Sequence, residues 1–252
     1  MRRRESFTLE TEPKDPQTVA YFDEHVPEYS VQRLQHAADW ISEHKRSDSS
    51  IVDVGCGAGN TLAFLQESTG IESVVGIDVS ENCLKQTHEQ VGYTTYHGSI
   101  LDSQFVRTIE PKFDFAIVAA VLHHLIGRSR RDCRRYASQA ITNAVALLRP
   151  GGHVVVLEPV FRPPIVMDAV FYGKKLVTSF TTARIPLFGY WNNIGAPVVS
   201  YYDAPKVRAM LEAAGTTVLA EWSDHDRRRS LVNSALQKRN ITLVASNVQS
   251  VE

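Results

Sequence analysis

The sequence predicts an α/β protein built around a doubly wound, mostly parallel sheet. Short apolar runs at 51–54, 74–80 and 113–121 have the length of strands that are buried on both faces. Stretches with the apolar spacing of helices lie between these runs, and this alternation is typical of parallel βαβ units. The last two apolar runs, at 216–222 and 240–247, are interpreted as an antiparallel pair that completes the sheet.

The composition is that of an ordinary globular protein, since 43% of the 252 residues are hydrophobic and 22% are charged. A formal net charge of −1 gives no reason to expect nucleic-acid binding. No apolar run approaches the roughly 20 residues that span a bilayer, so we expect no stable membrane insertion. The 3 cysteines are isolated, which argues against a disulfide framework or a structural zinc site and favours a cytoplasmic location.

One domain is expected over residues 17–252, after a polar tail at 1–16 that lacks periodicity and should be flexible. Residues 17–45 have helical spacing, and Pro27 divides them into two helices. A third helix is expected at 81–91, directly after the second strand.

A glycine-rich turn follows the first predicted strand. Gly55, Gly57 and Gly59 alternate through the turn, and Asn60 or Thr61 can cap the helix that follows. Glycines allow positive φ angles and let a ligand approach main-chain N–H groups closely. The turn therefore predicts a ligand site at the carboxyl end of the first strand.

The second strand ends in an acidic residue, Asp78, which indicates the kind of ligand. An acid at this position of a nucleotide-binding α/β sheet accepts hydrogen bonds from ribose hydroxyls. Dinucleotide enzymes share this geometry, but their G-x-G-x-x-G fingerprint requires Gly or Ala where this chain has Asn60. The turn here is G-x-G-x-G, and Asp53 lies two residues before its first glycine.

This pattern resembles the class I S-adenosylmethionine-dependent methyltransferases over roughly residues 20–160. The resemblance implies a Rossmann-like seven-stranded sheet, S-adenosylmethionine as cofactor and S-adenosylhomocysteine as product. Five motifs occur in the order and spacing of the family: VDVGCGAG (52–59), GIDVS (76–80), HGSILD (97–102), FDFAIVAAVLHHL (113–125) and LLRPGGHVVVLEP (147–159).

The resemblance also assigns roles to cofactor-binding residues. The glycines would hold the methionine end, Asp53 the ammonium side and Asp78 the ribose. The adenine edge would meet Ser99, the Ile100 N–H or Asp102, and these alternatives stay open because many relatives have Asp where this chain has Ser99. The expected cofactor-binding residues are Asp53, Gly55, Gly57, Gly59, Asp78, Val79, Ser99, Ile100, Asp102, Ala119, Tyr29 and Arg33.

Candidate catalytic residues follow the fourth and fifth strands. His123 and His124 emerge at the carboxyl end of the fourth strand, and Glu158 lies at the same edge on the fifth. In similar small-molecule O-methyltransferases, a histidine and an acid at these places deprotonate the acceptor. The alternatives are that the histidines only cap or pack, and that Glu158 is a helix cap or an ion-pair partner.

Residues 160–203 are interpreted as a helical, aromatic-rich insertion that forms the acceptor pocket for a small apolar or aromatic molecule. A buried helical mini-core or a homodimer interface is the alternative. Lys174, Lys175 and Arg184 could touch a membrane surface, although the basic charge there is thin. The arginines at 128–135 open a helix, so most of them should form a solvated face.

The function predicted from the sequence is methyl transfer to a small-molecule acceptor, with O-methylation favoured over N- or C-methylation. No set of metal ligands stands out, so no metal is expected. One alternative is a non-catalytic binding or assembly protein that retains the cofactor fold. A less favoured alternative is an NAD(P)-dependent oxidoreductase, against which Asn60 argues.

Overall fold

The computed structural model describes residues 31–110, 112–178, 198–225 and 238–247. Within these ranges, seven strands form one sheet in the order β3-β2-β1-β4-β5-β7-β6. The first five strands pair in parallel, and β7 lies antiparallel to both β5 and β6. The strands are β1 (Ser50–Val54), β2 (Ser73–Asp78), β3 (Thr94–His97), β4 (Phe113–Ala119), β5 (Leu148–Val160), β6 (Thr216–His225) and β7 (Arg239–Asn247).

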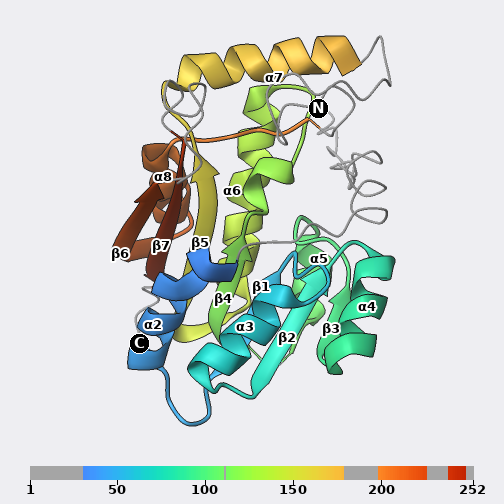
Figure 1. Cartoon of the computed structure of the whole chain (residues 1–252), viewed down its shortest axis with the longest axis vertical. Coiled ribbons are helices and arrows are strands. Elements are labelled where there is room, and N and C mark those ends of the chain that lie inside the picture. Colours follow the sequence, from blue (N-terminus) through green and yellow to red (C-terminus); the bar gives the residue numbers. More distant parts are fainter. Residues whose placement is uncertain (1–30, 111, 179–197, 226–237, 248–252) are drawn as a thin grey trace, which may run out of the picture.

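Helices cover both faces of the sheet, as Figure 1 shows. The helix α2 packs beside α3 on one face, and α6 packs against both α5 and α8 on the other. The described helices are η1 (Val31–Leu34), α2 (Gln35–His44), α3 (Asn60–Thr69), α4 (Glu81–Val91), α5 (Ser103–Thr108), η2 (Leu122–His124), α6 (Arg130–Ala146), α7 (Pro164–Thr178) and α8 (Ala204–Ala213). The predicted fold class, a Rossmann-like seven-stranded sheet with an antiparallel C-terminal hairpin, is confirmed.

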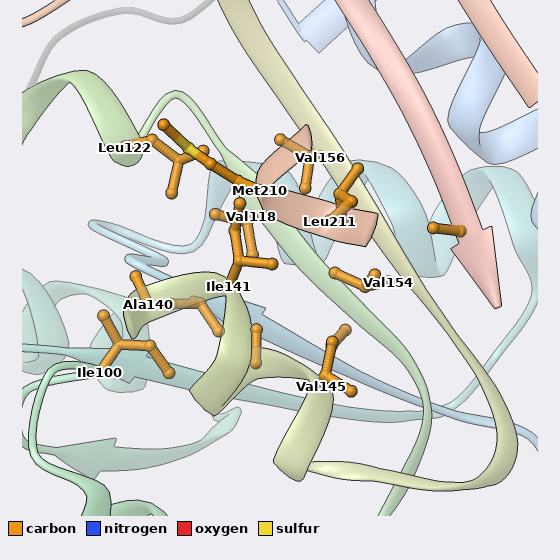
Figure 2. Packing of buried hydrophobic residues seen from close by; sticks show 14 of the residues in the cluster. Ile100, Val118, Leu122, Ala140, Ile141, Val145, Val154, Val156, Met210 and Leu211 are labelled. Atoms are coloured by element: carbon orange, nitrogen blue, oxygen red, sulfur yellow. The ribbon is translucent and has the colours of Figure 1, made fainter. Parts of the chain in front are cut away.

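The core consists of two apolar layers because alternate residues of each strand point to opposite faces. On β4, Phe115 and Ile117 belong to the layer under α2 and α3. Ala116 and Val118, between and after them, belong to the layer under α6 and α8. Figure 2 shows this second layer, with Ile141 of α6 directed toward the β4 and β5 side chains. Parallel strands buried on both faces produce the continuous apolar runs seen in the sequence.

The end of the fourth strand differs from the prediction. The fourth strand was expected to reach residue 121, but β4 ends at Ala119. Ala120 then adopts a φ of 59°, and among the described residues it is the non-glycine residue with a positive φ. This left-handed conformation turns the chain sharply out of the sheet, at a cost of about 1–2 kcal/mol. The turn brings η2 over the carboxyl end of the sheet.

Several sequence predictions concern residues outside the described ranges. They include the tail at 1–16, the first of the two N-terminal helices, and Tyr29, which was predicted to lie near the cofactor. The insertion at 160–203 is described in part, as the end of β5, the helix α7 and residues 198–203. In the parts of the chain that are described, no helix is both long and apolar enough to cross a membrane.

Candidate active site

The glycine turn after β1 has the backbone geometry that its sequence requires. Gly55, Gly57 and Gly59 have φ angles of 72°, 53° and 85°. The N–H groups of Gly55 and Cys56 donate to the Ile77 carbonyl oxygen at 2.7 and 3.1 Å, so the turn is attached to the end of β2. Positive φ at three alternating positions is accessible to glycine at little cost, which explains the residue type.

The three glycines differ in what surrounds them. A Cβ atom at Gly55 would lie 2.6 Å from Val121 Cγ2, and one at Gly59 would lie 2.8 Å from Thr87 Cγ2. A Cβ atom at Gly57 would meet nothing within 4 Å. Gly55 and Gly59 are therefore required by the fold, whereas Gly57 presents bare backbone to open space. A ligand that approaches the turn has this position available to it.

Asp53 of β1 is a buried carboxylate without a partner in the described structure. Its side chain is 1% exposed, and neither carboxylate oxygen has a hydrogen-bond partner there. Burial, and then the charge of Asp78, raises the pKa of Asp53 well above its usual value. A buried acid costs free energy unless a partner satisfies it, so this site suits a positively charged ligand group.

Asp78, the last residue of β2, lies beside the same turn. Its Oδ2 accepts a hydrogen bond from the Gly57 N–H at 2.9 Å, and its Oδ1 accepts one from the Ser80 N–H at 2.8 Å. These bonds fix the orientation of the carboxylate beside the glycine turn. The predicted proximity of the glycine turn, Asp53 and Asp78 is present in the structure.

The residues predicted near the adenine differ from one another in exposure and in the contacts that they make. Val79 is 37% exposed directly after β2, and Ser99 follows β3. Ile100 is 5% exposed, and its side chain belongs to the core layer under α6 rather than to an exposed apolar wall. Asp102 caps α5, because its Oδ1 accepts from Gln104 N at 2.8 Å.

Ala119 ends β4 and is half buried at the same edge of the sheet. It precedes Ala120, whose backbone N–H donates to Leu157 O at 2.7 Å. That bond extends the pairing of β4 with β5 into the left-handed turn. Ala120 is a feature that sequence reasoning missed, because an alanine gives no signal for positive φ.

The second part of the site is a buried pair formed by His123 of η2 and Glu158 of β5. His123 Nδ1 lies 2.7 Å from Glu158 Oε2, and both side chains are 1% exposed. Glu158 Oε1 accepts the Leu122 N–H at 2.7 Å. The carboxylate therefore holds both the main chain and the ring of η2, and of the two candidate histidines it binds His123.

Burial controls the protonation of this pair. Loss of solvation, and after it the positive charges of Arg33 and Lys238, lower the pKa of His123 to about 3. Burial raises the pKa of Glu158 to about 7, against the opposing effect of the Leu122 hydrogen bond. The imidazole is thus neutral at pH 7. With Nδ1–H donated to the carboxylate, Nε2 has a lone pair available, and Nε2 has no partner in the described structure.

An apolar cluster borders this pair. Phe161, Met167 and Tyr201 pack together, with ring centroids of Phe161 and Tyr201 4.4 Å apart. The Tyr201 ring stacks on His123 with a centroid distance of 5.2 Å. The Ser200 N–H also donates to the His123 carbonyl oxygen at 2.8 Å. Residues from the end of β5, from α7 and from 198–201 therefore meet at the histidine.

Arg130 is a further residue that sequence reasoning assigned to a solvated face. The arginines at 128, 131, 134 and 135 are exposed as predicted, but Arg130 is 7% exposed. Its Nε donates to Asp168 Oδ1 at 2.8 Å, and its Nη atoms donate to Ser200 Oγ and Tyr201 O. This one guanidinium fastens α7 and the 200–201 segment to α6. The sequence of a run of arginines does not indicate which of them is buried.

Fold and site together define a class of protein. A parallel sheet with a glycine turn after β1 and a carboxylate at the end of β2 is the arrangement of enzymes that bind an adenosyl group at the carboxyl edge. The buried Asp53 carboxylate, whose oxygens have no hydrogen-bond partner among the described residues, lies two residues before this turn. Residues 52–154 match the family described as "Methyltransferase domain". This match and the fold agree with the resemblance of the sequence to the class I S-adenosylmethionine-dependent methyltransferases.

Individual relatives agree with this assignment. A protein of Encephalitozoon cuniculi that is named as a methyltransferase is 27% identical over 139 residues, covering 54% of this chain and 59% of the relative. Ribosomal RNA small subunit methyltransferase C of Mannheimia succiniciproducens is 27% identical over 146 residues, which is 58% of this chain and 42% of that protein. This chain thus spans about half the length of the curated relatives that it matches.

A solved structure extends the likeness to the whole fold. The N-methyltransferase NodS from Bradyrhizobium japonicum, in complex with S-adenosylhomocysteine, has a TM-score of 0.59 to this chain. The match covers 92% of this chain and 100% of NodS at 15% sequence identity. At that sequence identity the likeness shows only that the two proteins share a fold. The cofactor of the family is S-adenosylmethionine.

Proposed function

We propose that the protein transfers a methyl group from S-adenosylmethionine to a hydroxyl of a small apolar or aromatic metabolite. The observation that supports this most directly is the buried His123–Glu158 pair, whose free Nε2 lone pair lies at the edge of the sheet where ligands bind in such folds. The neighbouring cluster of Phe161, Met167 and Tyr201 supports an apolar acceptor.

In this proposal the chain's own residues remove the acceptor proton. The cofactor supplies an activated methyl carbon bound to a positively charged sulfur. The acceptor O–H proton moves to His123 Nε2 as the oxygen forms its bond to that carbon. Glu158 holds Nδ1–H and stabilises the imidazolium that results, so it acts as the orienting partner of the base.

Burial of the base has a consequence for the order of binding. Nε2 has almost no solvent exposure, so an acceptor reaches it only after a covering side chain moves. Tyr201, which stacks on the ring, is the side chain that we assign to this movement. Exclusion of water afterwards would strengthen the pairing of the base with the acceptor.

For the cofactor we propose three binding groups. The open backbone at Gly57 would approach the methionine portion, and the orphaned carboxylate of Asp53 would pair with the ammonium group. Asp78, oriented by the Gly57 and Ser80 N–H groups, would accept the ribose hydroxyls. Arg33 remains the predicted contact of the cofactor carboxylate, and Tyr29 remains predicted to close the site.

The test of the catalytic proposal separates binding from turnover. We expect His123→Ala and Glu158→Ala to retain S-adenosylhomocysteine affinity in calorimetry while methyl transfer to a panel of phenols and aliphatic alcohols falls by about 10²–10⁴-fold. His88→Ala, an exposed histidine on α4, is the matched control and should keep full activity. Full activity in both site variants would mean that the enzyme only positions its reactants.

Other functions make different predictions in the same assays. The relative from Mannheimia succiniciproducens is named as an rRNA methyltransferase, so ribosomal RNA should be included as an acceptor. NodS is named as an N-methyltransferase, so amines belong in the panel as well. A non-catalytic protein would bind the cofactor and yield no S-adenosylhomocysteine with any acceptor. A nicotinamide cofactor in the purified protein would support an oxidoreductase instead.

A further inference from the structure

The helix α7 carries a row of exposed apolar side chains along one side. We name this row the outer stripe. Its members are exposed, with fractions of 76% for Ile165, 49% for Tyr172 and 61% for Leu176. It consists of Ile165, Ala169 and Leu176, with Tyr172 at its margin, where the Tyr172 hydroxyl accepts a hydrogen bond from the Arg130 N–H at 3.3 Å. Large apolar side chains exposed in a row on one helix are unusual on a surface that contacts only water.

The spacing of the stripe makes it one continuous surface. Its members are separated by four, three and four residues, so they align on one side of a helix over about 16 Å. Met167 and Phe171, on the other side, are 5% and 1% exposed and pack toward the body. Figure 1 shows α7 lying across the end of the molecule, outside the sheet and its covering helices. The orientation of α7 is thus set by its inner side, which leaves the stripe outward.

Exposed arginines lie near α7, and we name them the basic rim. Lys175 Nζ donates to the Gly127 and Arg128 carbonyl oxygens at 3.1 and 2.8 Å, which places the loop before α6 beside α7. The acidic member of α7, Asp168, is paired with Arg130 at 2.8 Å. The rim consists of the exposed Arg128 and Arg131, beside the start of α6, and Arg162, which precedes α7 by two residues. The surface is therefore locally positive, although the chain has a net charge of −1.

We propose that α7 docks on the interface of an anionic lipid bilayer, with the outer stripe among the acyl chain ends and the basic rim against lipid phosphates. An amphipathic helix with a basic margin is suited to lie in this interface. Fifteen residues extend about 22 Å, less than the roughly 30 Å of a bilayer core, so the helix lies on the membrane and does not span it.

Charge decides between this partner and a second copy of the chain. Two copies that paired through the outer stripe would bring two basic rims together, and their repulsion opposes the contact. Lipid phosphates are negatively charged, so contact between them and the basic rim involves no such repulsion. The rim brings Arg162 together with Arg128 and Arg131, which are distant from it in the sequence.

Docking would also place the proposed active site at the membrane. A short connection joins Glu158 of β5 to Pro164, where α7 begins. An apolar acceptor dissolved in the bilayer would then meet the protein at the edge that holds His123 and Glu158. This extension rests on the proposed function, whereas membrane docking itself does not.

The experiment is co-sedimentation of the full chain with vesicles of phosphatidylcholine alone and of phosphatidylcholine mixed equally with phosphatidylglycerol. We expect the chain to bind the mixed vesicles at least about tenfold more strongly, and about 0.5 M salt to reduce that binding. Ile165→Ser combined with Leu176→Ser should lower binding by at least about tenfold, with an unchanged melting temperature because both side chains are exposed. Leu219→Ser, which removes a leucine that is 53% exposed on β6, is the matched control and should bind like the unmodified chain.

A charge variant tests the other half of the proposal. Arg128→Ser combined with Arg162→Ser should lower the preference for phosphatidylglycerol by about fivefold for each arginine. Equal binding of the unmodified chain to neutral and mixed vesicles, or equal binding of the stripe variant, would overturn the proposal. A dimer in analytical ultracentrifugation that the stripe variant dissociates would also overturn it, in favour of a second copy. Vesicle binding without methyl transfer would leave docking intact and refute the proposed function.

Discussion

Substitution of Gly57 by alanine is the sharpest test of the cofactor site. Gly57 has a φ of 53°, and an added Cβ would meet no protein atom within 4 Å. The cost to the fold is therefore conformational. An alanine loses about 1–2 kcal/mol in the left-handed region, and the stiffer unfolded chain returns about half of that, so we expect destabilisation by about 1 kcal/mol.

The expected effect on binding is larger, because the added methyl group would occupy the space through which a ligand approaches the turn. We expect the affinity for S-adenosylhomocysteine, measured by isothermal titration calorimetry, to fall at least about tenfold, which corresponds to ~1.4 kcal/mol. Urea unfolding of the same preparation without ligand measures the stability loss separately.

Gly92 provides a closely matched control for this substitution. It ends α4 with a φ of 68°, and a Cβ there would also meet nothing within 4 Å. Gly92→Ala should therefore lose the same ~1 kcal/mol of stability while its affinity stays unchanged. If both variants bound S-adenosylhomocysteine alike, the open backbone at Gly57 would not face the cofactor, and the reasoning from the glycine turn would be wrong.

Two further predictions concern buried charges. The native pKa of Asp53 is raised above its usual 3.8, so the native state binds more protons than the unfolded state in the pH range above that value. Stability without cofactor should consequently fall as pH rises through that range. Asp53→Asn should remove this dependence of stability on pH and raise the urea midpoint at pH 7. The same variant should bind the cofactor more weakly. A lower urea midpoint at pH 7 would contradict the conclusion that Asp53 is a buried acid without a partner. Arg130→Ala should lower the free energy of unfolding by about 2 kcal/mol or more, because it removes the donor to Ser200 Oγ and to the Tyr201 carbonyl oxygen. Substitution of the exposed Arg131 by alanine should change that free energy by no more than about 0.5 kcal/mol. Equal thermal shifts in the two variants would refute this role of Arg130.

The parallel half of the sheet could be predicted because its signals are local. Buried parallel strands are short apolar runs, and a turn that needs positive φ needs glycine, so 51–59 and 74–78 can be identified without tertiary information. The proximity of Asp53 and Asp78 also follows, since carboxyl ends of adjacent parallel strands lie at one edge. These inferences require only that the strands pair.

Other features depend on contacts that no local pattern encodes. His123 and His124 are neighbours with the same side chain, and only the left-handed turn at Ala120 directs His123 toward Glu158. The same limit applies to Asp102, which resembles a ligand in sequence and serves as the cap of α5. Strand pairing can be inferred from a pattern, but the rotation of a side chain about a turn cannot.

The amino-acid sequence by itself determined the fold class, the glycine turn and the two carboxylates beside it, because hydrophobic periodicity and glycine conformation act within a few residues. Only the tertiary structure decided which arginine is buried, which histidine binds the acid and which side of α7 remains exposed. Those outcomes depend on desolvation by segments far apart in the chain. Arg130 is buried because α6, α7 and residues 200–201 meet around it, and burial by distant segments leaves no signal in the spacing of arginines.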